Sequence, residues 1–62
     1  MTKENAVKIY NKLEVLLFDL DNLFYNTGTA AEFPNEVRAF IMAGRELERK
    51  VETKFYKDGK AI

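Results

Sequence analysis

Residues 3–26, KENAVKIYNKLEVLLFDLDNLFYN, decide the fold of this 62-residue chain. Their apolar residues recur at alternating steps of three and four, at Ala6, Ile9, Leu13, Leu16, Leu20 and Leu23. This spacing predicts a helix that packs on another helix. Tyr10, Leu17 and Phe24 each follow a member of this stripe by one residue. They widen it to the breadth expected of a helix that faces a protein core.

Local signals bound this helix and predict a second one. Thr2 is suited to cap the first helix, and Gly28 to end it with left-handed backbone geometry. Pro34 suits the first turn of a helix over about residues 34–56, whose apolar stripe is Val37, Phe40, Gly44, Leu47, Val51 and Phe55. Because the linker is short, we expect this helix to fold back antiparallel on the first. A break into two shorter helices at Gly44 is the alternative.

The sequence therefore predicts an all-α, antiparallel two-helix hairpin that forms a single domain, residues 1–62. A chain of this size buries only about 60% of its unfolded surface and is marginally stable alone. Cysteine and histidine are both absent, so neither disulfides nor an ordinary zinc site supplies support. We expect the support to come from a homodimer, in which two hairpins form a four-helix bundle.

Charge and hydropathy narrow the classes of partner and location. Ten basic residues balance ten acidic ones, which argues weakly against nucleic acid. Residues 1–5 lead into an amphipathic pattern, so no signal peptide is expected. The longest apolar stretch, residues 15–25, is interrupted by Asp19, Asp21 and Asn22 and is shorter than a membrane span. The expected location is the cytoplasm, with no membrane association.

A second apolar ridge consists of Val15, Phe18 and Tyr25, on the side of the first helix opposite its stripe. One explanation is a homodimer, in which two hairpins bury these residues or share the stripe as an antiparallel four-helix bundle. The other is a docking surface for a different protein, and the two are compatible. Asp19 and Asn22 stand at the rim of the ridge, where polar groups fix orientation. The pattern favours a small non-enzymatic regulatory or adaptor protein that binds a protein stoichiometrically. No catalytic residue, metal site or cofactor is expected.

Residues 15–22, VLLFDLDN, resemble the first motif of the haloacid dehalogenase superfamily of phosphohydrolases. The resemblance implies a nucleophile at Asp19 and an acid/base at Asp21, delivered by the end of a strand. Leu23 stands where the family has threonine, and the chain ends before the family's lysine and second acidic motif. Because residues 3–26 are predicted to be helical, we do not expect these two carboxylates to converge.

The chain as a whole is similar to the Rop family of plasmid RNA-binding regulators. The likeness lies in its length, the opening Met1-Thr2-Lys3, and a second-helix stripe followed by Phe55 and Asp58-Gly59. The resemblance implies a helical hairpin that dimerises into a four-helix bundle and binds RNA through its paired first helices. With the stripes in register, Asn11 matches the family's RNA-binding face, where Asp19 would repel phosphate.

Basic residues on the second helix provide an independent indication of nucleic-acid binding. These residues are Arg38, Arg45, Arg49, Lys50 and Lys54, and Lys57 follows them. Glu46, Glu48 and Glu52 are interleaved among them, as on a solvated helix face. An RNA-binding regulator is therefore the second hypothesis, behind the protein-binding one.

Overall fold

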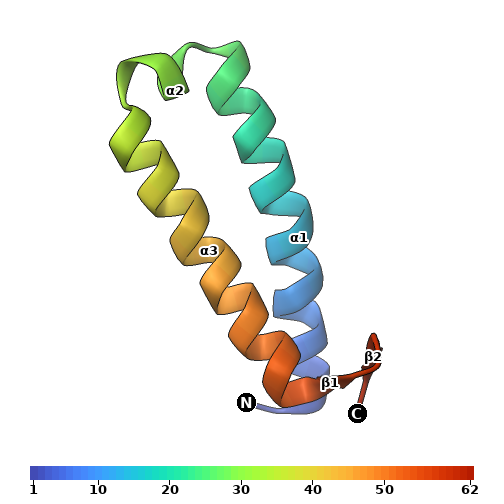
Figure 1. Ribbon diagram of the computed structural model, residues 1–62. Coiled ribbons are helices and arrows are strands. Elements are labelled where there is room, and N and C mark those ends of the chain that lie inside the picture. Colours follow the sequence, from blue (N-terminus) through green and yellow to red (C-terminus); the bar gives the residue numbers. More distant parts are fainter.

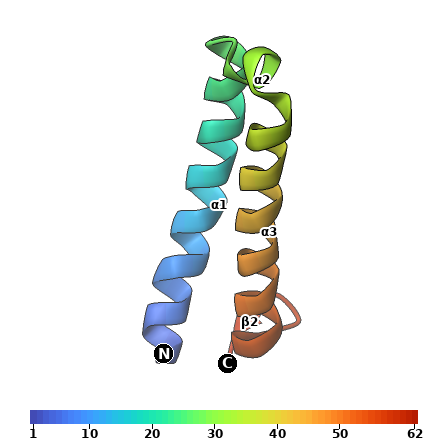
Figure 2. The same cartoon turned by 90° about the vertical axis from the view of Figure 1, so that its left-hand side faces the viewer.

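A computed structural model describes all 62 residues and is mostly helical. Its elements are α1 (Lys3–Asn26), α2 (Thr29–Glu32), α3 (Pro34–Phe55), β1 (Tyr56–Lys57) and β2 (Lys60–Ala61). Helices α1 and α3 run side by side in opposite directions, with α2 joining them at one end (Figure 1, Figure 2). The molecule measures 40 × 20 × 16 Å, so it is a single layer, since one helix is about 10–12 Å wide.

The predicted boundaries of the long helices are confirmed, apart from the end of the second. The Thr2 hydroxyl accepts a hydrogen bond from the backbone N–H of Asn5 at 3.2 Å and so caps α1. Gly28 has a left-handed φ of 78°, and Pro34 opens α3. Helix α3 continues through Gly44 without a break and ends at Phe55. Within the predicted linker, residues 29–32 form one helical turn, α2.

The C-terminal residues form a small β-hairpin, which the helix pattern did not predict. Strands β1 and β2 pair antiparallel, and the turn between them is Asp58-Gly59, with φ values of 54° and 79°. Two positive φ angles in a two-residue loop are the geometry that the Asp-Gly dipeptide favours. The N–H of Ile62 also donates to the carbonyl of Phe55 at 2.8 Å, so the hairpin folds back on the end of α3.

The helix contact is centred on Leu17, which the sequence placed one residue beyond Leu16, at the side of the stripe. Leu17 is 1% exposed and is the only large side chain that is fully buried. A Cβ atom added at Gly44 would lie 2.5 Å from Leu17 Cδ2, so the missing side chain is what admits Leu17. The missing side chain at Gly44 therefore lets the two helices approach closely. It rotates α1 so that its contact line passes through Leu17.

This rotation leaves five residues of the predicted stripes partly in water. They are between 41% and 53% exposed: Ile9, Leu16, Leu23, Phe40 and Leu47. Only four residues of the chain are buried, namely Ala6, Leu17, Glu48 and Val51. The two helices consequently share a narrow buried contact, and apolar side chains beside this contact remain partly exposed to water.

Tyr10 of α1 contacts α3 and β1 at the end of the molecule where the strands lie. Its hydroxyl donates a hydrogen bond to Glu52 Oε2 at 2.6 Å, and its ring packs on Tyr56 with the centroids 4.6 Å apart. The bond to the Glu52 carboxylate raises the pKa of Tyr10 well above its ordinary value, and burial adds to the rise. The contact stabilises the neutral phenol in the folded chain.

We predict that Tyr10→Phe lowers the free energy of unfolding by about 1 kcal/mol at pH 7 because this hydrogen bond is lost. A folded-state pKa that is raised stabilises the fold fully below the unfolded pKa of about 10. The advantage of the wild type should therefore shrink as the pH rises beyond about 10. Urea denaturation of both proteins at pH 7 and at pH 11 measures this. Equal stabilities at pH 7 would contradict the prediction.

Candidate functional site

The helix pair exposes apolar side chains on two opposite sides. Residues two apart on a helix point about 200° away from each other, so Leu16 and Phe18 lie on different sides of α1. We name one side the leucine face, made of Ile9, Leu16, Leu23, Phe40 and Leu47. We name the other the aromatic ridge, made of Val15, Phe18 and Tyr25. The ridge contains three of the five partner-binding residues predicted from the sequence, and the other two are Asp19 and Asn22.

The structure leaves the aromatic ridge exposed, as the sequence predicted. Its three side chains are between 60% and 74% exposed, more than any residue of the leucine face. Asn22 stands in the same row as Val15, Phe18 and Tyr25, because the row advances by three, four and three residues. The ridge follows the outer part of α1 and approaches the end of the molecule where α2 lies.

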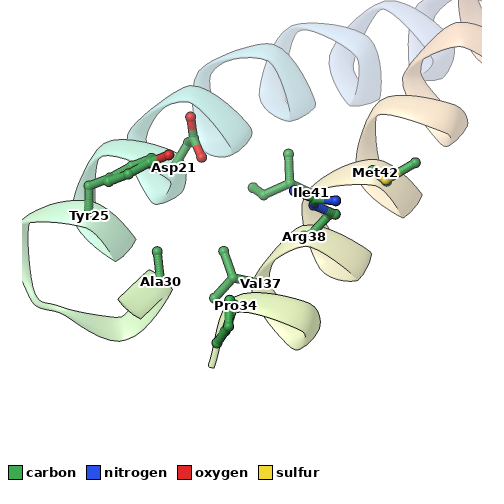
Figure 3. A pocket seen from close by; sticks show the side chains of 8 residues that line it. All are labelled: Asp21, Tyr25, Ala30, Pro34, Val37, Arg38, Ile41 and Met42. Atoms are coloured by element: carbon green, nitrogen blue, oxygen red, sulfur yellow. The ribbon is translucent and has the colours of Figure 1, made fainter. Parts of the chain in front are cut away.

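A groove lies beside Tyr25 where α1, α2 and α3 meet (Figure 3). Its volume is about 290 Å³, and we call it the closed-end groove. Its lining is mainly apolar and comprises Asp21, Tyr25, Ala30, Pro34, Val37, Arg38, Ile41 and Met42. The groove has the size to take one or two side chains of another protein. It is smaller than most sites that enclose a small molecule.

A second, shallower groove lies along the middle of the same side. Its volume is about 350 Å³, and its lining is Glu14, Val15, Phe18, Asp19 and Arg45. Carboxylates of α1 and an arginine of α3 border each of the two grooves. Every apolar residue of the aromatic ridge therefore lines a groove, and so does Asp19, whereas Asn22 lines neither.

The two aspartates of the phosphohydrolase-like motif do not converge. Both lie on α1, not at the end of a strand, and Asp19 borders the middle groove whereas Asp21 borders the closed-end groove. No three carboxylates come close enough together to hold a metal ion. The arrangement that the resemblance implies, with two aspartates on one phosphoryl group, is not formed.

The structure divides the basic residues of α3 between two sides of the helix. Arg38 and Arg45 line the two grooves, and Arg49 continues their row, whereas Lys50 and Lys54 follow the opposite margin. Lys54 lies over the ring of Phe55, with its Nζ 5.6 Å from the centroid. Asn11 lies on the exposed surface of α1. The predicted nucleic-acid residues are thus not gathered on one face.

Ion pairs occupy two of the three arginines. Arg49 Nη2 lies 2.6 Å from Glu46 Oε1, and this hydrogen-bonded pair lowers the pKa of Glu46 and raises that of Arg49. Arg45 Nη1 lies 3.2 Å from Glu48 Oε1. Glu48 is buried, and its other oxygen, Oε2, has no hydrogen-bond partner. Neither arginine presents an uncompensated positive charge to a phosphate group.

The closed-end groove was missed by the sequence reasoning. Its lining includes Val37, which belongs to the predicted apolar stripe of the second helix, and Ile41, the neighbour of Phe40 in that stripe. Its end wall is Ala30 of α2, a turn of helix that the sequence did not predict. The sequence did contain one signal for this groove. Tyr25 and Asp21 lie one turn apart on the first helix, and Met42 and Arg38 lie one turn apart on the second, so each helix offers an apolar residue beside a charged one.

Neither long helix carries an apolar stretch of the length that crossing a membrane requires. Comparisons with protein families, with characterised proteins and with solved structures find no significant match to this chain.

Proposed function

We propose that this chain is a small non-enzymatic regulatory or adaptor protein of the cytoplasm, which binds a partner protein stoichiometrically through the aromatic ridge. The same proposal includes self-association of the chain as a homodimer. One observation carries the binding role. Val15, Phe18 and Tyr25 project on the outside of a folded helix pair, and each lines a groove on the same side.

Physical chemistry supports this use of the ridge. Large apolar side chains that gather on one surface, with hollows beside them, are typical of protein interfaces. Phe18 and Tyr25 lie seven residues apart, about two helical turns. The form of partner that fits this spacing is an amphipathic helix, whose own apolar residues repeat at three, four and seven.

The charges beside the ridge give the partner an orientation. Asp21 on α1 and Arg38 on α3 border the closed-end groove, and they make no ion pair with each other. Asp19 and Arg45 border the middle groove. Arg45 is already paired with Glu48, so the unpaired basic group on this side of α3 is Arg38. A bound helix therefore meets acidic groups along α1 and Arg38 on α3, so a partner with complementary charges on its two edges is favoured in one direction.

The test replaces both aromatic residues by serine, in the double variant Phe18→Ser/Tyr25→Ser. Tagged wild-type protein should retain one partner in about equimolar amount, and the double variant should lose it. Both side chains are exposed, so the helical circular dichroism should persist. Isothermal titration with the purified partner should show an affinity loss of at least about 30-fold, as two interface aromatic residues imply.

A matched control is Ile62→Ser, which removes an apolar side chain that is also about 60% exposed but lies outside the ridge. This variant should bind like the wild type. Binding through apolar contacts should also change little between low and high salt, whereas binding to RNA falls steeply. The proposal fails if the double variant retains the same partner with unchanged affinity and helicity.

A further inference from the structure

The leucine face consists of one row of partly exposed apolar residues on each long helix. On α1 it repeats every seven residues, at Ile9, Leu16 and Leu23, and on α3 it has the same step at Phe40 and Leu47. Three of the α3 residues that line the grooves, Arg38, Met42 and Arg45, stand two residues from Phe40 or Leu47 and so lie on the other side of α3. Both rows therefore point away from the grooves and toward one shared side.

The accessible surface of the chain is larger than its mass predicts. It is 4957 Å² for 7.2 kDa, whereas a folded monomer of that mass exposes about 4,100 Å². The difference, about 800 Å², equals the area that one partner contributes to an ordinary stable protein interface. The excess accessible surface is thus about the area that the chain would bury in one further protein interface.

The residues of the leucine face are arranged symmetrically about one height along the pair. On α1, Ile9 and Leu23 lie seven residues to either side of Leu16. On α3, Phe40 and Leu47 lie on either side of Ala43 and Gly44. Because Gly44 packs against Leu17, the centres of these two rows lie at about the same height. A two-fold axis that crosses the helices at this height therefore places each apolar residue of the leucine face opposite an apolar residue of the second copy.

Charged residues at the margins of the face are complementary about the same axis. Lys12 and Asp19 flank Leu16 on α1 at nearly equal steps, four and three residues away. Asp19 is also four residues from Val15, so it stands on the outer edge of α1, between the leucine face and the middle groove. Glu36 and Lys50 flank the centre of the α3 row in the same way. The two-fold axis brings Lys12 near Asp19 of the second copy. It also brings Glu36 near Lys50 of the second copy.

An axis parallel to the helices gives a different result. It would lay α1 over α3 of the second copy, at the heights that the contact of Leu17 with Gly44 defines. Lys12 would then approach Lys50 of the second copy, and two like charges would repel. The charge pattern favours the axis that crosses the helices.

We infer that a second copy of this chain covers the leucine face, related by a two-fold axis that crosses the helices at the height of Leu16 and Gly44. The inference rests on the proposed self-association and specifies its surface and symmetry. Leu16 meets Leu16 of the second copy, Ile9 meets Leu23, and Phe40 meets Leu47. The ends that carry α2 then lie at opposite ends of a four-helix bundle. Both aromatic ridges remain on the outside, so one dimer presents two partner sites.

The first experiment reverses one charged pair and measures the dimer by sedimentation equilibrium at low salt. Glu36→Lys and Lys50→Glu should each weaken dimerisation by about 5- to 30-fold, since each creates two like-charge contacts. The double variant Glu36→Lys/Lys50→Glu restores the pairing with exchanged signs and should return to within about 3-fold of the wild type. Losses that add in the double variant would overturn the inferred axis.

A distance measurement then tests the orientation of the two copies. The chain has no cysteine, so Ala31→Cys in α2 accepts a single nitroxide label per copy. The inferred axis places the two labels at least about 30 Å apart, from the rise of α1 between its middle and its end. A distance under about 20 Å would place the α2 ends side by side and overturn the inference.

A wild type that stays monomeric would overturn the inferred dimer as well. The test of Phe18 and Tyr25 with a partner protein does not depend on the dimer, so its result would stand.

Discussion

Replacement of Leu17 by alanine is expected to lower the free energy of unfolding by about 3–5 kcal/mol, the largest loss of any single truncation in this chain. Leu17 is the one large side chain that is fully buried, so its removal leaves a cavity at the centre of the contact between α1 and α3. A 62-residue domain has a total stability of only about 3–9 kcal/mol. The variant should therefore be largely unfolded at 37 °C.

The matched control is Val15→Ala, which truncates an exposed apolar residue of the same helix. It should change the stability by no more than about 0.5 kcal/mol. Thermal and urea unfolding followed by circular dichroism measures both variants. Because the inferred dimer would make stability depend on concentration, all proteins are compared at one chain concentration. A Leu17→Ala loss no larger than that of Val15→Ala would show that the core is elsewhere.

Gly44→Leu is expected to destabilise the helix pair by at least about 2 kcal/mol, although leucine is the better helix former by about 1 kcal/mol. The cause is steric, because a Cβ atom at this position already lies 2.5 Å from Leu17 Cδ2. The remaining leucine atoms would force the helices apart. They would also remove the contact that sets the heights of the two rows of the leucine face.

The steric cause has its own control and its own rescue. Ala39→Leu adds a similar volume on the outer surface of α3, where it should change stability by less than about 0.5 kcal/mol. Combining Gly44→Leu with Leu17→Ala should cost less than the two single losses added, because the new side chain enters the space that Leu17 vacates. Additive losses in denaturant unfolding would contradict direct contact between the two positions.

The sequence predicted the helices well because their signals are local. Thr2, Gly28 and Pro34 set the boundaries through backbone geometry that each residue prefers on its own. The β-hairpin was missed although Asp58-Gly59 carries its strongest local signal. Apolar periodicity runs to Phe55, directly before this hairpin, and so it predicts a helix up to about residue 56 and no strand beyond it.

The exact contact line on α1 could not be predicted from the sequence. Leu16 and Leu17 both belong to a wide apolar stripe, and periodicity does not distinguish which one faces α3. The choice depends on a residue 27 positions away, Gly44, whose missing side chain accepts Leu17. This tertiary contact divides the stripe into a buried line and the leucine face.

The sequence predicted the exposed residues of the candidate site but not the grooves beside them, because only the former depend on helical spacing alone. The exposed ridge of Val15, Phe18 and Tyr25 follows from helical spacing alone, and the structure leaves these residues exposed. The closed-end groove depends on α2, whose position against α1 and α3 no sequence pattern specified. The grooves beside the ridge therefore required the three-dimensional arrangement.

The central claim is that one helix pair has two unlike apolar sides, of which the leucine face is covered by a second copy. Sedimentation equilibrium of the wild type, from low micromolar to millimolar chain concentration, tests this claim most directly. The expected result is a reversible dimer of twice the 7.2 kDa chain mass, with no larger species. A well-folded monomer over the whole range would contradict it, because the leucine face would then remain in water.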